Sequence, residues 1–246
     1  MMRDIFYFLF LLVSFSSCYK KPASPVQTIP GPLGEPILPD KVLNVAFLVL
    51  DGVYNSELVA PMDILHHTVF HTEKGMQVFT VAPVRDTITS FEGLKIIPDY
   101  SFLTDSLPDI DILVVPSAEH SMDTDLENED LISFVRVYGN KADFVMSLCD
   151  GAFVLAKAGL VDGKESTTFP SDIGRYREKY PELIVHENVS FVHDGKLITS
   201  VGGAKSYDPA LYLAELLYGK KAAEGLGKGL VIDWRLNDIK YIKVDQ

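Results

Sequence analysis

The sequence predicts an α/β domain built on a doubly wound, mostly parallel sheet with helices on both faces. Two observations lead to this prediction. Short, almost unbroken apolar runs are typical of strands that are buried on both faces of a sheet. Between these runs, apolar residues recur at helical spacing, and repeated alternation of strand and helix favours a parallel sheet.

The first strand is expected over 43–50, where only Asn44 interrupts the apolar run and Asp51-Gly52 ends it. A helix is expected next, because apolar residues recur every three or four positions at Leu58, Met62, Leu65 and Val69. Pro61 either starts this helix or kinks it. The next elements are expected to be a strand over 78–82, a hairpin over 88–97, a strand over 110–116 and a helix over 130–138.

The second half continues the alternation. A strand over 143–148 and a helix over 152–160 are expected to flank Cys149, and Ser171 is expected to be the N-cap of a helix that reaches Tyr180. The pattern then predicts a hairpin turning at Asp194-Gly195 and a last clear helix over 208–217.

The composition bounds the size and the partners of the protein. A chain of 246 residues with 47% apolar side chains can bury the core of one domain. The formal net charge is −12 and the acidic residues are scattered. This argues against a nucleic-acid partner, because nucleic acids bind to basic protein surfaces.

The amino terminus is interpreted as a targeting segment. The apolar run over 5–15 is too short to span a bilayer and suits the apolar region of a signal peptide. The string Ser-Phe-Ser-Ser-Cys ends at Cys18 and resembles a bacterial lipobox, in which the cysteine is lipidated. The alternative is an ordinary cleaved signal peptide with an incidental cysteine.

These segments divide the chain into four parts. We expect a signal peptide over 1–17, a lipid-anchored, proline-rich linker over 18–40, a folded domain over 41–220 and a packed extension over 221–246. The mature protein would then be exported and attached to a bacterial membrane through Cys18.

Cys149 is the candidate nucleophile, because a buried strand runs straight into it and a helix follows. Such an elbow exposes the nucleophile above the sheet edge. The amino end of the helix would favour a thiolate, and the N–H of Asp150 could stabilise an oxyanion. The alternative is a buried cysteine that acts as a small hydrophobic residue.

The elbow string SLCDGAFVLAKAGLVDGKESTTFP resembles the nucleophile region of the ThiJ/PfpI superfamily. Other segments agree in order, among them LNVAFLVLDGVYNSELVAPMDIL and KLITSVGGAKSYDPALYLAELL. The similarity covers about 43–219. It is closest to the branch that holds isonitrile hydratases and the sensor halves of AraC-type regulators. The resemblance implies the class I glutamine amidotransferase-like fold, which is flavodoxin-like, and it allows a homodimer.

The resemblance also implies a partner for the nucleophile. In the superfamily an acidic residue of the first loop or helix touches the cysteine, and Glu57 takes that place here. A buried Glu57 would stay protonated and donate a hydrogen bond to a thiolate. We expect the Asp150 side chain, which would oppose the thiolate, to turn to solvent.

Two further positions depart from the superfamily pattern. Phe169 stands where some members have histidine, so no Cys-His pair is evident. Ser117-Ala118 replaces a pair of glycines that supplies the second oxyanion amide. His120 is a candidate for lining the pocket, and no metal and no cofactor are expected.

Two hypotheses of different classes follow. The first is a cysteine-dependent enzyme that acts on a small electrophilic substrate, either as a hydratase or as an amide-type hydrolase. The second is a non-catalytic, extracytoplasmic domain that binds or senses a small molecule on the same fold.

Overall fold

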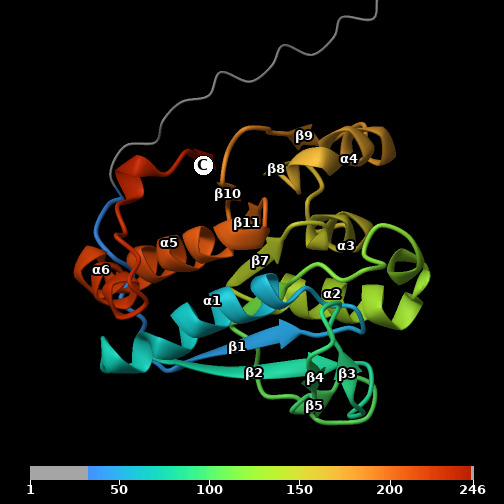
Figure 1. The fold of residues 1–246 in the computed structure, drawn as a ribbon, viewed down its shortest axis with the longest axis horizontal. Helices are drawn as coiled ribbons and strands as arrows, with labels where there is room; N and C mark the ends of the chain where they lie inside the picture. Colours follow the sequence, from blue (N-terminus) through green and yellow to red (C-terminus); the bar gives the residue numbers. More distant parts are fainter. Residues whose placement is uncertain (1–32, 245–246) are drawn as a thin grey trace, which may run out of the picture.

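The computed structural model describes residues 33–244, which form one α/β unit around an eight-stranded sheet (Figure 1). Six of its eight strands run in one direction, whereas β10 and β12 run in the opposite direction, because β10 is antiparallel to β11 and parallel to β12. In spatial order the strands are β12 (Tyr241–Val244), β10 (Phe191–Asp194), β11 (Leu197–Ser200), β7 (Phe144–Leu148), β6 (Ile112–Val115), β1 (Leu43–Leu48), β2 (Met76–Ala82) and β5 (Tyr100–Ser101).

Within residues 33–244, six α-helices cover the two faces of this sheet. Residues of α1, α5 and α6 share one buried apolar cluster, and residues of α2, α3 and α4 share another. The helices are α1 (Asn55–His67), α2 (Glu129–Lys141), α3 (Gly151–Lys157), α4 (Ile173–Lys179), α5 (Tyr207–Tyr218) and α6 (Lys220–Gly229).

Strand β1 shows why both layers are needed. Successive side chains of a strand point to opposite faces of the sheet. Val45 and Phe47 lie in the cluster with α1 and α5, whereas Ala46 and Leu48 lie in the cluster with α2 and α3. All four are almost completely buried, so the sheet is apolar on both sides and the doubly wound prediction is confirmed.

The predicted elements are found with small shifts at their ends. The hairpin over 88–97 is the antiparallel pair β3 (Ile88–Thr89) and β4 (Lys95–Ile96), and the pair β10 and β11 is the second predicted hairpin. Helix α1 begins at Asn55, so Pro61 lies inside it and does not start it.

Two parts of the fold differ from the sequence-based expectation. Ser171 is not an N-cap, because a short 3-10 helix over Pro170–Asp172 precedes α4 and the Ser171 hydroxyl donates to the Asp172 carboxylate. The small parallel pair β8 (Glu165–Ser166) and β9 (Ile184–Val185) was not predicted, since two-residue strands leave no readable period.

The carboxyl-terminal segment contributes to the main sheet. Strand β12 pairs in parallel with β10 at the sheet edge, and Trp234 donates a hydrogen bond of 2.7 Å from its indole to Glu215 on α5. Within residues 33–244, no helix combines the length and the apolar character needed to cross a membrane.

Candidate active site

The junction of β7 and α3 places Cys149 in a strained backbone conformation. Its φ is +53°, a region that residues with a side chain rarely adopt. The Cys149 N–H donates to the Ser200 carbonyl at 2.9 Å, and the Thr168 hydroxyl lies 3.0 Å from the Cys149 carbonyl oxygen. These contacts on both sides of the residue hold the elbow that the sequence predicted.

The first residue of α3 leaves no room for a side chain. A Cβ added at Gly151 would lie 2.1 Å from the carbonyl oxygen of Val115, at the end of β6. The elbow therefore packs directly on the neighbouring strand, and only glycine allows this close approach.

Glu57 reaches the elbow from the first turn of α1. Its carboxyl accepts hydrogen bonds from the Ser117 N–H at 3.1 Å and the Gly203 N–H at 3.3 Å, and it interacts with the Cys149 thiol. The side chain is only 4% exposed. Burial raises the pKa of Glu57 from its ordinary value of 4.5 to about 7, although these hydrogen bonds oppose the shift.

Burial also raises the pKa of the Cys149 thiol. The negative charges of Glu57 and Asp150 raise it further, and the Asp150 N–H, which favours the thiolate, does not offset them. The resting side chain is therefore a thiol. The expected thiolate is disfavoured mainly because the sulfur is buried, and further because two carboxyl groups approach it, whereas the sequence argument weighed mainly the helix end.

Asp150 differs most from the expectation. Its side chain does not turn to solvent: the residue is 7% exposed, and its Oδ2 lies 3.6 Å from the Cys149 sulfur. Its Oδ1 lies 2.9 Å from the Thr168 hydroxyl, and burial raises the pKa of Asp150 to about 6.

Thr168 explains why Asp150 stays inside. The Thr168 hydroxyl has two acceptors within reach, the Cys149 carbonyl and the Asp150 carboxyl, but it carries a single proton. Both contacts become hydrogen bonds when Asp150 is protonated and donates to the hydroxyl oxygen. The raised pKa of Asp150 is consistent with this arrangement.

The amides of Ser117 and Ala118 are used within the protein. The Ser117 N–H donates to Glu57, and the Ala118 N–H donates to the Ser121 hydroxyl at 2.8 Å. Ser117 reaches the site through Glu57, and both N–H groups are directed to protein acceptors. The Asp150 N–H interacts with the sulfur and favours its thiolate form.

His120 and Phe169 lie further out. The His120 imidazole is about half exposed and pairs with Asp123 at 3.3 Å. Phe169 is 39% exposed and follows Thr168 in the chain. Among residues 33–244, neither ring makes a hydrogen bond or a ring contact with Cys149.

Three residues of the site were missed by the sequence argument. Thr168 and Gly202 touch the elbow directly, since a Cβ on Gly202 would lie 2.5 Å from the Cys149 Cβ. The phenol of Tyr54 interacts electrostatically with Cys149 and Glu57, and its ring lies 4.8 Å from that of Phe91. The sequence offered one signal for Gly202: two glycines follow β11 directly, and β11 ends beside β7, the strand that leads to Cys149.

Metal ligands are not grouped in the described part of the chain. No set of three or more His, Cys, Asp or Glu side chains there has the arrangement of a metal site. Cys149 is a free cysteine, and Cys18 lies outside the described residues.

Comparison with known proteins identifies the family. The model of the DJ-1/PfpI family matches residues 43–216, a stretch that contains the elbow and Glu57. The chain belongs to the DJ-1/PfpI family. The isonitrile hydratase of Pseudomonas putida is 31% identical over 183 residues, which are 74% of this chain and 75% of that protein.

Solved structures of other proteins share the fold. DJ-1beta of Drosophila melanogaster has a TM-score of 0.68 at 23% identity, with 78% of this chain and 99% of that chain covered. An AraC family transcriptional regulator from Pseudomonas putida has a TM-score of 0.66 at 22% identity, with coverage of 76% and 99%. At these identities the likeness shows the fold alone, and both enzymes and regulators are among the relatives.

Proposed function

We propose that this protein is a cysteine-dependent hydratase that adds water to a small electrophilic carbon, as in an isonitrile. The observation that supports the proposal most strongly is the position of the buried Glu57 carboxyl next to the Cys149 thiol at the elbow. The similarity to an isonitrile hydratase points in the same direction.

Glu57 is suited to move a proton to and from the sulfur. A general base works best when its pKa lies near the operating pH, and the pKa of Glu57 is about 7. A buried thiol with a raised pKa attacks only when a base removes its proton. The Glu57 carboxyl lies next to that thiol, so it is placed to take the proton as the sulfur attacks.

The chemistry balances for an isonitrile, R–N≡C. The Cys149 sulfur bonds to the terminal carbon while Glu57 takes the thiol proton and delivers it to the same carbon. The product of this step is a thioimidate, R–N=CH–S–Cys. Water adds to the thioimidate carbon, the carbon–sulfur bond breaks, and the proton returns to the sulfur. The released product is the formamide R–NH–CHO, and the enzyme is regenerated.

Amide-type hydrolysis is the less favoured reaction for this site. An amide releases an amine, which needs a proton from a general acid, and a histidine usually supplies it in cysteine hydrolases. Among residues 33–244 no imidazole contacts Cys149: His120 pairs with Asp123, and His186 pairs with Glu165. Hydration of an isonitrile requires no protonated amine to leave.

The test is product formation from an alkyl isonitrile. The wild-type protein is expected to produce the N-substituted formamide, and Cys149→Ser is expected to lose this activity by a factor of about a thousand or more. Mass spectrometry of wild-type protein quenched during turnover is expected to show the mass of one isonitrile added at Cys149. Unchanged turnover in Cys149→Ser would refute the mechanism.

The alternative function is a binding or sensing domain without catalysis. The raised pKa of Cys149 favours this alternative, and so does the regulator among the structural relatives. If no isonitrile or amide is converted and Cys149 resists alkylation from neutral to mildly alkaline pH, the binding domain becomes the better assignment. A homodimer, as implied by the superfamily resemblance, remains a prediction.

We further propose that the protein is exported and anchored through a lipid on Cys18, with the segment over 18–40 as a linker. In a bacterial host, the full chain is expected to sediment with membranes and to incorporate radiolabelled palmitate. Cys18→Ala is expected to remove the label, whereas Cys149→Ser is expected to keep it. A wild-type chain that is soluble and unlabelled would contradict the anchor.

A further inference from the structure

The surroundings of Cys149 make its sulfur a poor leaving group unless the sulfur is protonated. Burial and two neighbouring carboxyl groups raise the pKa of the Cys149 thiol. The effects that keep the resting residue a thiol also make it costly for the sulfur to leave a bound product as a thiolate. The second step of the proposed hydration therefore needs a group that delivers a proton to the sulfur.

The Asp150 carboxyl is in position for this transfer. Its Oδ2 lies 3.6 Å from the Cys149 sulfur, and the residue is buried. Its other oxygen, Oδ1, lies 2.9 Å from the Thr168 hydroxyl, which in turn lies 3.0 Å from the Cys149 carbonyl oxygen. Thr168 therefore fixes the carboxyl so that Oδ2 is the oxygen turned toward the sulfur.

Glu57 reaches the same sulfur from another part of the fold. It lies on α1, and its two oxygens accept from the Ser117 and Gly203 N–H groups. Asp150 precedes α3 and is held by Thr168, which follows β8. The sulfur thus has two carboxyl neighbours that are fixed independently, and two such groups can serve two different proton transfers.

We propose that Asp150 is a second catalytic residue, which transfers a proton to the sulfur as the product is released; this inference rests on the hydratase proposal. Water adds across the C=N bond of the thioimidate and gives R–NH–CH(OH)–S–Cys. The Asp150 carboxylate takes the hydroxyl proton, the C=O bond forms and the carbon–sulfur bond breaks. Asp150 then gives the same proton to the sulfur. The products are R–NH–CHO and the thiol, and Asp150 is again a carboxylate.

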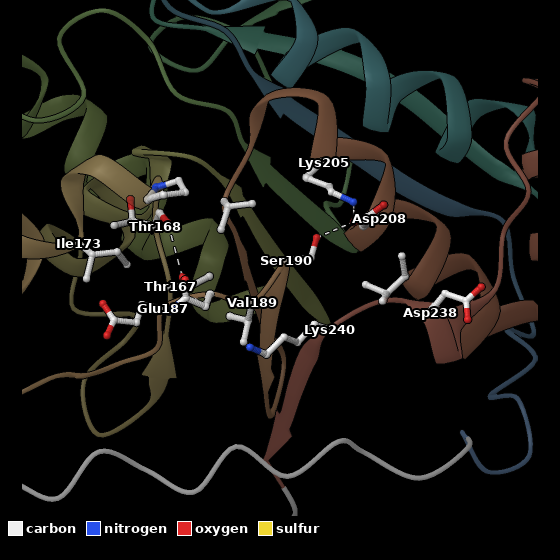
Figure 2. A pocket seen from close by; sticks show the side chains of 14 residues that line it. Thr167, Thr168, Ile173, Glu187, Val189, Ser190, Lys205, Asp208, Asp238 and Lys240 are labelled. Carbon is white, nitrogen blue, oxygen red and sulfur yellow. Dashed lines mark hydrogen bonds and ion pairs between the residues drawn. The ribbon is translucent and has the colours of Figure 1, made fainter.

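The acid strength of Asp150 and the space beside Thr168 suit this role. Burial raises the pKa of Asp150 to about 6, so the carboxyl can both accept and release a proton near neutral pH. Thr168 also lines a pocket of about 380 Å³ (Figure 2). One water takes about 30 Å³ in the liquid, so this pocket can supply the water of the second step on the side where Thr168 contacts Asp150.

The test separates the two steps by mass spectrometry of intact protein, quenched at short times after mixing with an alkyl isonitrile. In Asp150→Asn, product release is expected to slow by a factor of about a hundred, so the adduct at Cys149 should accumulate. Adduct formation should be no slower than in wild type, because the substitution removes a carboxyl that raises the pKa of the thiol. A damaged fold would slow both steps.

Two further variants complete the test. Asp172→Asn is the matched control: Asp172 also acts on Asp150 through its charge, but its carboxylate is engaged with the Ser171 hydroxyl, so release should match wild type. Thr168→Val keeps the shape of the side chain and removes the hydroxyl that orients Asp150. As a positioning residue, Thr168 is expected to affect release about ten-fold, again with accumulation of the adduct.

The outcomes distinguish this inference from the hydratase proposal. If wild type forms no formamide, the hydratase proposal is wrong and the inference fails with it. If wild type forms formamide and Asp150→Asn releases it at the same rate, only the inference is wrong. If Asp150→Asn forms the adduct more slowly and none accumulates, Asp150 acts in the first proton transfer, and the inference is also wrong.

Discussion

Replacing Glu57 with glutamine is expected to stabilise the protein above pH 7 and, at the same time, to abolish most of its reaction. The folded protein raises the pKa of Glu57 from 4.5 to about 7. A carboxyl whose pKa is raised by folding supports the folded state below its unfolded pKa, and this support is lost as the pH rises through the folded value. Wild-type stability should therefore fall between about pH 4.5 and 7.

The size of the effect follows from the shift. One pKa unit corresponds to about 1.4 kcal/mol, so the ionised Glu57 costs about 3 kcal/mol at pH 8. Glutamine carries no charge, so this cost disappears in the variant. However, glutamine has one acceptor oxygen where the carboxylate has two, so its hydrogen bonds with the Ser117 and Gly203 N–H groups are weaker, and this loss costs about 1 kcal/mol. A net gain of about 2 kcal/mol is expected at pH 8, with none at pH 5.

The measurement is urea unfolding of wild type and Glu57→Gln at several pH values between 5 and 8, together with the alkylation rate of Cys149. Without the base, alkylation at pH 7.5 is expected to slow by a factor of about a hundred. Asp63→Asn is the matched control, since Asp63 lies on the same helix without a resolved role in the site. If the variant is less stable than wild type at pH 8, the ionised Glu57 does not destabilise the folded protein, and the prediction is wrong.

Replacing Gly151 with alanine is expected to destabilise the protein by about 3 kcal/mol or more. The added Cβ would lie 2.1 Å from the Val115 carbonyl oxygen and 3.3 Å from the backbone of Pro116, and backbone atoms cannot move aside as a flexible side chain can. Either α3 shifts away from β6 or the folded state is lost. In both cases the strained elbow at Cys149 is disturbed, so its alkylation rate should change as well.

Gly174→Ala provides the matched control for this substitution. Gly174 lies in the first turn of α4, is exposed and has no atom within 4 Å of its added Cβ. Alanine is expected to be neutral there or to stabilise by about 0.5–1 kcal/mol, because it favours a helix. Equal effects of the two substitutions in urea unfolding would contradict the close packing of Gly151 on β6.

The patterns that repeat along the chain were readable from the sequence alone. The apolar run that begins at Leu43 had to be a strand buried on both faces, because no other element hides successive side chains on opposite sides. The elbow at Cys149 was also predicted, since strand, nucleophile and glycine follow one another within a few residues. Glu57 came from the family resemblance, and the structure places it beside the sulfur.

Local order along the chain therefore determined the fold class, most of the long elements and the position of the nucleophile. Only the tertiary structure decided the protonation of the site, because a pKa depends on burial and on charges brought together from distant segments. Asp150 is turned inward by Thr168, which is far from it in sequence, and Glu57 is held by amides that follow two other strands.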